Sequence, residues 1–138
     1  MRRLKSGEDR QERGANLVEM ALVLPLLALF LVAILDFGRA FNNYIIVTNA
    51  AREGARYASH FPGAQSDIQQ ATVREAADSG IVLDTADVFV TTGLGGIAAG
   101  EPITVEVEYT FDTIIGGLVG LNQLTLRSGT RMVIFGLD

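Results

Sequence analysis

The feature that most constrains this chain is a long apolar run that surrounds a single glutamate near its start. From Met20 to Leu35 the sequence has no charged or polar side chain. With Leu17 and Val18 the run reaches about 19 positions, the length at which an α-helix crosses the hydrocarbon core of a bilayer. Glu19 lies inside this run, and a carboxylate inside a membrane helix is costly in free energy. It therefore marks a candidate functional site.

The charges on either side of the run predict its orientation. The first 14 residues hold five Lys or Arg and three Asp or Glu, a net of +2, whereas the whole chain carries −5. Positive flanks stay in the cytoplasm, so we expect a single pass with everything after Asp36 outside. A cleaved secretory signal is less consistent, because its apolar region is shorter and ends in a small-x-small site. The acidic remainder argues against a nucleic-acid partner.

The pattern of the chain divides it into four parts. Residues 1–14 are polar and charged without periodicity and are expected to be a disordered leader. Residues 15–36 are the transmembrane part of a long helix, and residues 37–60 extend that helix outward. The extension is predicted because small and apolar residues continue at intervals of three and four: Phe37, Ala40, Phe41, Tyr44, Val47, Ala51, Ala55 and Ala58. His60-Phe61-Pro62-Gly63 is the first stop signal. Residues 61–138 form a small extracytoplasmic domain.

This outer domain is predicted to be α+β. A short second helix is expected to start with a capping box, Ser66 paired with Gln69, and to end at Gly80. Three strands follow, at residues 87–92, 103–111 and 124–135, with a break or bulge at Ser128-Gly129. The middle strand alternates strictly between apolar and polar residues. A three-stranded antiparallel sheet with one apolar face needs a cover, which the two helices can supply.

Small residues recur along the outer extension of the long helix. Ala50, Gly54 and Ala58 are four apart, as are Ala51 and Ala55. Such spacing flattens one helix face and lets another backbone approach closely. The partner is either the chain's own sheet or a neighbouring subunit.

Catalytic and metal-binding chemistry is not indicated. The chain has no cysteine and one histidine, His60, so a thiolate or histidine zinc cluster is not possible. The acidic residues Glu101, Glu106, Glu108 and Asp112 could hold calcium, but strand alternation explains them as a solvated face. We therefore expect no cofactor, no bound metal, no small-molecule substrate and no enzymatic activity.

An apolar cluster near the end of the middle strand is expected to be part core and part contact patch. Its members are Phe111, Ile114, Ile115, Leu118, Val119 and Leu121.

Two segments resemble the TadE-like (TadE/TadG) family, pseudopilins of the tight-adherence, or Flp, pilus system. They are residues 13–25, RGANLVEMALVLP, and residues 50–56, AAREGAR. The resemblance implies that a prepilin peptidase cuts between Gly14 and Ala15, which leaves Glu19 at mature position five. One departure is Met20, where many prepilins have phenylalanine.

The resemblance further implies a minor pilin or pseudopilin, a structural or priming subunit in the assembly of a type IV-like pilus used for surface attachment. Its partners would be the membrane, the prepilin peptidase, other pilin subunits and the assembly platform. Glu19 would set the subunit register by pairing with the N-terminus of a neighbour. The chain would reside in the cytoplasmic (inner) membrane or in an extracellular pilus. An uncleaved single-span anchor carrying an extracytoplasmic binding module is the alternative; a membrane enzyme is a third class.

Overall fold

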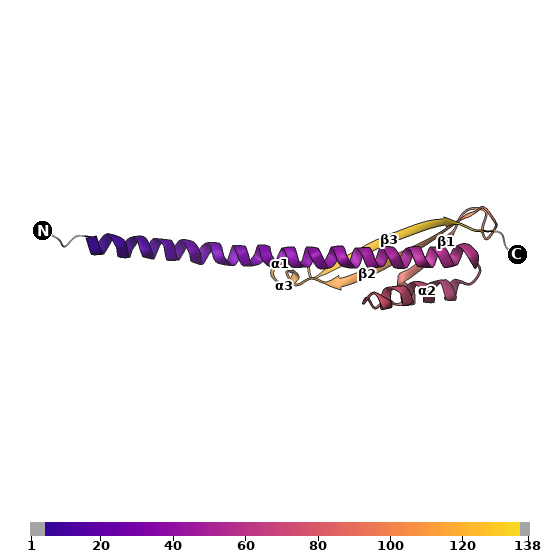
Figure 1. Ribbon diagram of the computed structural model, residues 1–138, viewed down its shortest axis with the longest axis horizontal. Coiled ribbons are helices and arrows are strands. Elements are labelled where there is room, and N and C mark those ends of the chain that lie inside the picture. The colour runs from indigo at the N-terminus through magenta and orange to yellow at the C-terminus, as the bar shows by residue number, and fades with distance from the viewer. Residues whose placement is uncertain (1–4, 136–138) are drawn as a thin grey trace.

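A computed structural model describes residues 5–135, with side chains described for residues 14–117 and 120–135. One helix dominates the molecule: α1 runs from Lys5 to His60, 56 residues, or about 84 Å at 1.5 Å per residue. Its C-terminal part carries a compact α+β unit, while its N-terminal part projects as a bare rod (Figure 1). The remaining elements are α2 (Gln65–Asp78), a 3₁₀ turn (Thr85–Asp87), β1 (Val88–Thr92), β2 (Pro102–Asp112), α3 (Gly116–Val119) and β3 (Gln123–Val133). The predicted α+β class is confirmed.

The start of α1 differs from the prediction, and its end agrees. The helix begins at Lys5 rather than near Ala15, so the expectation of a disordered leader is wrong for residues 5–14. Residues 1–4 lie outside the described residues. Lys, Arg, Glu and Gln dominate residues 5–14 and are good helix formers, and extending an existing helix is much easier than nucleating one. The helix ends at His60, as the following Pro62 and Gly63 predict.

The three strands form one antiparallel sheet in the order β1–β2–β3. Its register pairs Val90 with Val105, and Val105 with Thr130. The predicted alternation of β2 is confirmed, because Ile103, Val105 and Val107 are fully buried. The outer half of α1 and α2 cover this apolar face.

The predicted bulge at Ser128-Gly129 is wrong. Glu106 pairs with Gly129 and Val107 with Ser128 in an unbroken ladder. Gly129 instead makes room for a neighbour: a Cβ built there would lie 2.9 Å from Cγ of Glu106. Ser128 is used as a contact, since its hydroxyl lies 3.0 Å from that of Thr48 on α1. Both residues therefore serve the regular sheet and its packing on the helix.

The second helix also starts differently from the prediction. The N-cap is Ala64, which makes no side-chain cap, so Ser66 and Gln69 form no capping box. The Gln69 amide donates instead to the carbonyls of Thr85 (3.1 Å) and Val88 (3.0 Å). It ties α2 to the start of β1, a contact that no local pattern announces.

The end of α2 at Gly80 is as predicted. Gly80 has a φ of 92°, which an L side chain rarely adopts. Its N–H donates to Ala77, and the Ile81 N–H donates to Ala76. These two bonds make a Schellman C-terminus.

The predicted stripe on the outer helix packs on the sheet only from Val47 onward. Val47, Ala51, Ala55 and Ala58 are fully buried, whereas Phe37, Phe41 and Tyr44 are exposed. The reason is position: at 100° per residue these three aromatics lie on a different side of α1 from the buried residues.

Candidate functional site

The Gly14–Ala15 bond lies in an open part of α1. Both residues are exposed, and a Cβ built at Gly14 would meet nothing within 4 Å. Glycine in a helix interior costs about 1 kcal/mol relative to alanine. With no tertiary contact to offset that cost, the helix is intrinsically weak at this bond.

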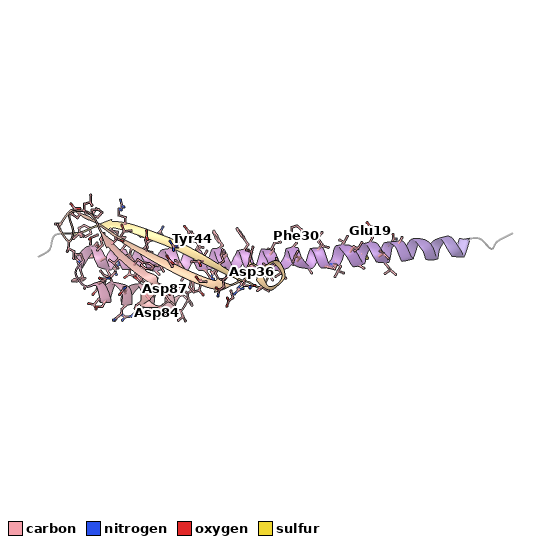
Figure 2. All side chains as sticks on the ribbon, turned by 180° about the vertical axis from the view of Figure 1, so that it is seen from behind. Glu19, Phe30, Asp36, Tyr44, Asp84 and Asp87 are labelled. Carbon is pink, nitrogen blue, oxygen red and sulfur yellow. The ribbon has the colours of Figure 1, made fainter. Side chains whose placement is uncertain are left out.

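Glu19 is exposed one turn further along the helix. Its neighbours on the helix surface are apolar, among them Met20, Val23 and Leu27. Among the described side chains, none of the hydrogen bonds or ion pairs found involves Glu19. At 100° per residue, Phe30 and Tyr44 lie within about 20° of Glu19 around the helix. Figure 2 shows these three side chains along the projecting rod and its continuation. The carboxylate thus heads an apolar stripe that the chain itself does not cover.

The apolar run has no packing partner within the chain. The most apolar window of α1 has a mean hydropathy of 2.7, and none of it is buried. Large side chains are exposed all around it, including Leu17 (68%) and Phe30 (61%). In the part of the chain that the structure describes, α1 is the one helix long and apolar enough to cross a membrane. By length and composition, α1 is therefore a membrane anchor that crosses once.

The small residues of the outer helix are packed inside the chain. Ala50, Ala51, Ala55 and Ala58 have no exposed surface. Gly54 is the closest point of approach: a Cβ built there would overlap Oγ1 of Thr72 on α2. It would also lie 3.1 Å from Cγ1 of Val105 on β2. The structure thus uses this surface for contact with the chain's own sheet and second helix.

The charged residues of the same segment lie on the opposite side. Arg52 and Arg56 are exposed and Glu53 is half-buried. The Arg56 guanidinium donates to both carboxylate oxygens of Glu53, with Nε 2.8 Å from Oε2. This bond lowers the pKa of Glu53 and raises that of Arg56. The pair stabilises the helix locally and leaves Arg52 free for solvent or a partner.

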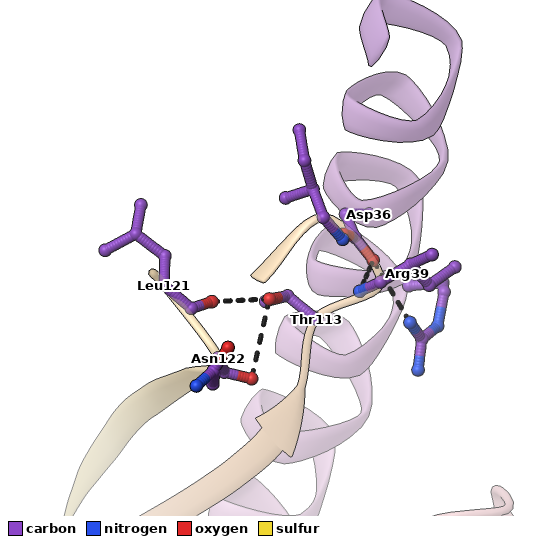
Figure 3. A network of polar contacts seen from close by, with 7 residues as sticks. Asp36, Arg39, Thr113, Leu121 and Asn122 are labelled. Atoms are coloured by element: carbon purple, nitrogen blue, oxygen red, sulfur yellow. Dashed lines mark hydrogen bonds and ion pairs between the residues drawn. The ribbon is translucent and has the colours of Figure 1, made fainter. Parts of the chain in front are cut away.

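Asp36 is a site residue that the sequence reasoning missed. It is almost fully buried, at 7% exposure, although it is charged. Its two carboxylate oxygens accept the N–H groups of Ile114 (3.0 Å) and Ile115 (2.8 Å), and Arg39 donates to it at 3.1 Å (Figure 3). Asp36 therefore fastens the loop between β2 and β3 to the helix at the end of the apolar run. The available signal was its place as the first charge after Glu19.

The same loop is closed at its base by Thr113. The Thr113 N–H donates to the carbonyl of Asn122 at 3.0 Å, and its hydroxyl donates to the carbonyl of Leu121 (Figure 3). The loop is thus closed across its base and attached to α1 at its start.

Comparison with known proteins gives one match. Residues 14–56 match the family model of the TadE-like protein. The predicted resemblance to the TadE-like family is confirmed over that segment. It supports an association with the tight-adherence pilus, in a family that is structural rather than enzymatic. Neither the curated proteins nor the solved structures searched include a significant match.

The limits of the TadE-like match coincide with the predicted motifs. It begins at Gly14 and ends at Arg56, so it includes Glu19 and the small-residue segment. The sheet lies outside it. The part of the chain with a known relationship is therefore the long helix.

Proposed function

We propose that this chain is a minor pilin or pseudopilin, a structural or priming subunit in the assembly of a tight-adherence pilus. The observation that carries the proposal is Glu19, an exposed carboxylate on a bare apolar helix that matches the TadE-like family from Gly14 onward. An acidic group in that setting is unfavourable unless another molecule supplies a partner. A structural subunit needs no catalytic group, in keeping with the lack of predicted enzyme chemistry.

The partner of Glu19 would be created by processing. A prepilin peptidase cutting after Gly14 would leave a new α-amino group on Ala15. Within one subunit that amine lies about 6 Å from Glu19 along the helix axis, since four residues rise 1.5 Å each. The amine of a neighbouring subunit could approach more closely and pair with the carboxylate in a low-dielectric setting. Such a pair would fix the axial register of adjacent subunits.

The remaining partners follow from this role. The basic N-terminal flank places the N-terminus in the cytoplasm and the sheet outside, with the chain in the cytoplasmic membrane before assembly. Other pilin subunits and the assembly platform would then contact the exposed apolar helix.

The test compares Glu19→Leu with Glu19→Gln. Both should insert into the membrane at least as well as the native chain, because a costly charge has gone. Both should lose co-purification with pilus subunits, because breaking a desolvated pair costs about 3–5 kcal/mol. Membrane level, measured in parallel, is the control for folding and insertion. Undiminished co-purification of both variants would remove the register mechanism.

One observation favours the alternative function. Helix α1 runs without interruption through Gly14 and Ala15, as expected of an anchor that is never cut. An uncleaved single-span anchor with an extracytoplasmic binding module would keep residues 1–14 in cells. It would also tolerate both substitutions of Glu19.

A further inference from the structure

The loop between β2 and β3 presents apolar side chains to the outside. No charged residue occurs between Asp112 and Arg127. Within this stretch Phe111 belongs to the core next to the loop, at 6% exposure, but Ile114 is 55% and Leu121 68% exposed. The apolar cluster predicted from the sequence is thus divided between core and surface. Its exposed part needs an occupant.

The position of this loop identifies the occupant. The backbone of Ile114 and Ile115 is hydrogen-bonded to Asp36, one residue after Leu35. The uninterrupted span Leu17–Leu35 covers about 28 Å as a helix, close to the ~30 Å hydrocarbon core of a bilayer. When the span fills the core, Asp36 lies at the outer boundary, and the loop fastened to it lies at the same depth.

We propose that the β2–β3 loop, Thr113–Asn122, is a second membrane contact that rests on the outer surface of the bilayer. Ile114 and Leu121 would enter the boundary between lipid headgroups and acyl chains, where exposed apolar groups are favourable. The partner is a lipid surface, argued from the continuity of the loop with the end of the span. This inference rests on the proposed membrane span but not on cleavage at Gly14 or on assembly.

The charges near the loop fit this location. Asp36 and Arg39 form an ion pair at 3.1 Å, so they neutralise each other locally. The Arg39 guanidinium also lies 5.7 Å from the centre of the Phe111 ring, which keeps the arginine beside the loop. Arginine at the end of a membrane helix is well suited to headgroup phosphates. The loop and the helix end together form a surface that is apolar at its tip and polar at its margin.

Two attachment points have a mechanical consequence. A single helix leaves an outer domain free to rotate and tilt about the helix axis. A loop seated on the lipid, with its backbone tied to Asp36, would hold the sheet at one height and one rotation. The domain would lose that contact when the helix leaves the bilayer.

The chain contains no tryptophan, so single tryptophans can report depth in the full-length protein. The probes are Leu121→Trp in the loop, Phe30→Trp in the span, and Leu94→Trp in the fully exposed loop between β1 and β2. Each variant is reconstituted into phosphatidylcholine vesicles with or without lipids brominated along the acyl chain. We expect brominated lipid to halve, roughly, the fluorescence at positions 30 and 121 and to leave position 94 unchanged.

The three probes separate the inference from the span beneath it. Strong quenching at position 30 with quenching at 121 no greater than at 94 would overturn the loop contact and leave the span intact. No quenching at position 30 would remove the span and the inference together. A blue-shifted but unquenched signal at 121 would mean that protein covers the loop, which also overturns the proposal. Ile114→Trp repeats the loop measurement at an independent position.

Discussion

The two halves of α1 carry opposite kinds of side chain on their surfaces. Between Leu17 and Leu35 the side chains are large and exposed, whereas between Val47 and Ser59 the residues facing the core are mostly alanine, with Gly54 among them, and are fully buried. The outer half is thin because the sheet supplies the bulk, through Ile103, Val105 and Val107. The inner half is bulky because its partner is absent from the chain. The comparison indicates that the outer half serves the chain's own fold and the inner half serves other molecules.

The boundary between the halves is built from the sheet side. Asp36 ends the apolar run and binds the loop between β2 and β3. A buried charge with several donors is stable where an unpaired one would not be. The change of role along one helix is therefore fixed by a specific contact.

The largest effect is expected at Gly14. Gly14→Leu should abolish processing between Gly14 and Ala15, because the added side chain would crowd the peptidase site. The substitution leaves the fold intact, since nothing lies within 4 Å of a Cβ at this position. N-terminal mass spectrometry of the protein from its native membrane gives the answer.

Gly38→Leu is the matched control for this experiment. Gly38 lies in the same helix and is equally open, but it is far from the predicted cut. Its processing should match that of the native chain. Normal processing of Gly14→Leu, or a native N-terminus at Met1, would contradict the assignment of the inner half to assembly.

The next effect concerns the thin half of the helix. Gly54→Ala should destabilise the outer domain by about 1–3 kcal/mol, because overpacking a tight core is costly and exceeds the gain in helix propensity. The new Cβ would overlap the hydroxyl of Thr72, which is itself buried and bonded to the Ile68 carbonyl at 2.8 Å. Thermal or chemical unfolding of the full chain in detergent measures the change.

A double-mutant cycle sharpens this prediction. Thr72→Ala removes the overlapping hydroxyl, so the second substitution in Gly54→Ala/Thr72→Ala should cost less than it does alone. Gly38→Ala should be neutral or stabilising. Equal stabilities for Gly54→Ala and Gly38→Ala would mean that the outer helix is not tightly packed on the sheet.

The smallest effect is expected on the exposed side of the outer helix. Arg56 lowers the pKa of Glu53 below its ordinary value of 4.5. A lowered carboxyl pKa stabilises the folded state above the unfolded pKa, and the benefit is lost as the pH falls through the folded value. Glu53→Gln should therefore cost at most about 0.5 kcal/mol at neutral pH, as is usual for exposed pairs. The difference from the native chain should vanish in acid; a loss above 2 kcal/mol would place Glu53 in a contact that the chain alone does not show.

Much of the fold could be predicted because its signals are local. The alternation of Ile103, Val105 and Val107 predicted β2, and Pro62-Gly63 predicted the end of α1. The apolar run predicted the membrane helix. What failed depends on distant contacts: Gln69 bonds to the Val88 carbonyl rather than capping its own helix. Gly129, similarly, reflects the space that Glu106 needs across the ladder.

The candidate site was predictable to the same extent. Glu19 and Gly14 follow from the run and its flank, within one stretch of sequence. The role of Asp36 depends on Ile114 and Ile115, which are 78 and 79 residues away. Spacing along the chain contains no information on such a contact.

The most direct test of the contrast between the two halves is site-specific photo-crosslinking in the native membrane. An aliphatic diazirine side chain is placed at Leu26, which is 55% exposed, or at Val47, which is fully buried. We predict that the probe at Leu26 joins this chain to other pilus subunits, while the probe at Val47 forms links only within the chain. Intermolecular links from Val47 at the level of Leu26, or only lipid adducts from Leu26 in pilus-producing cells, would contradict the account.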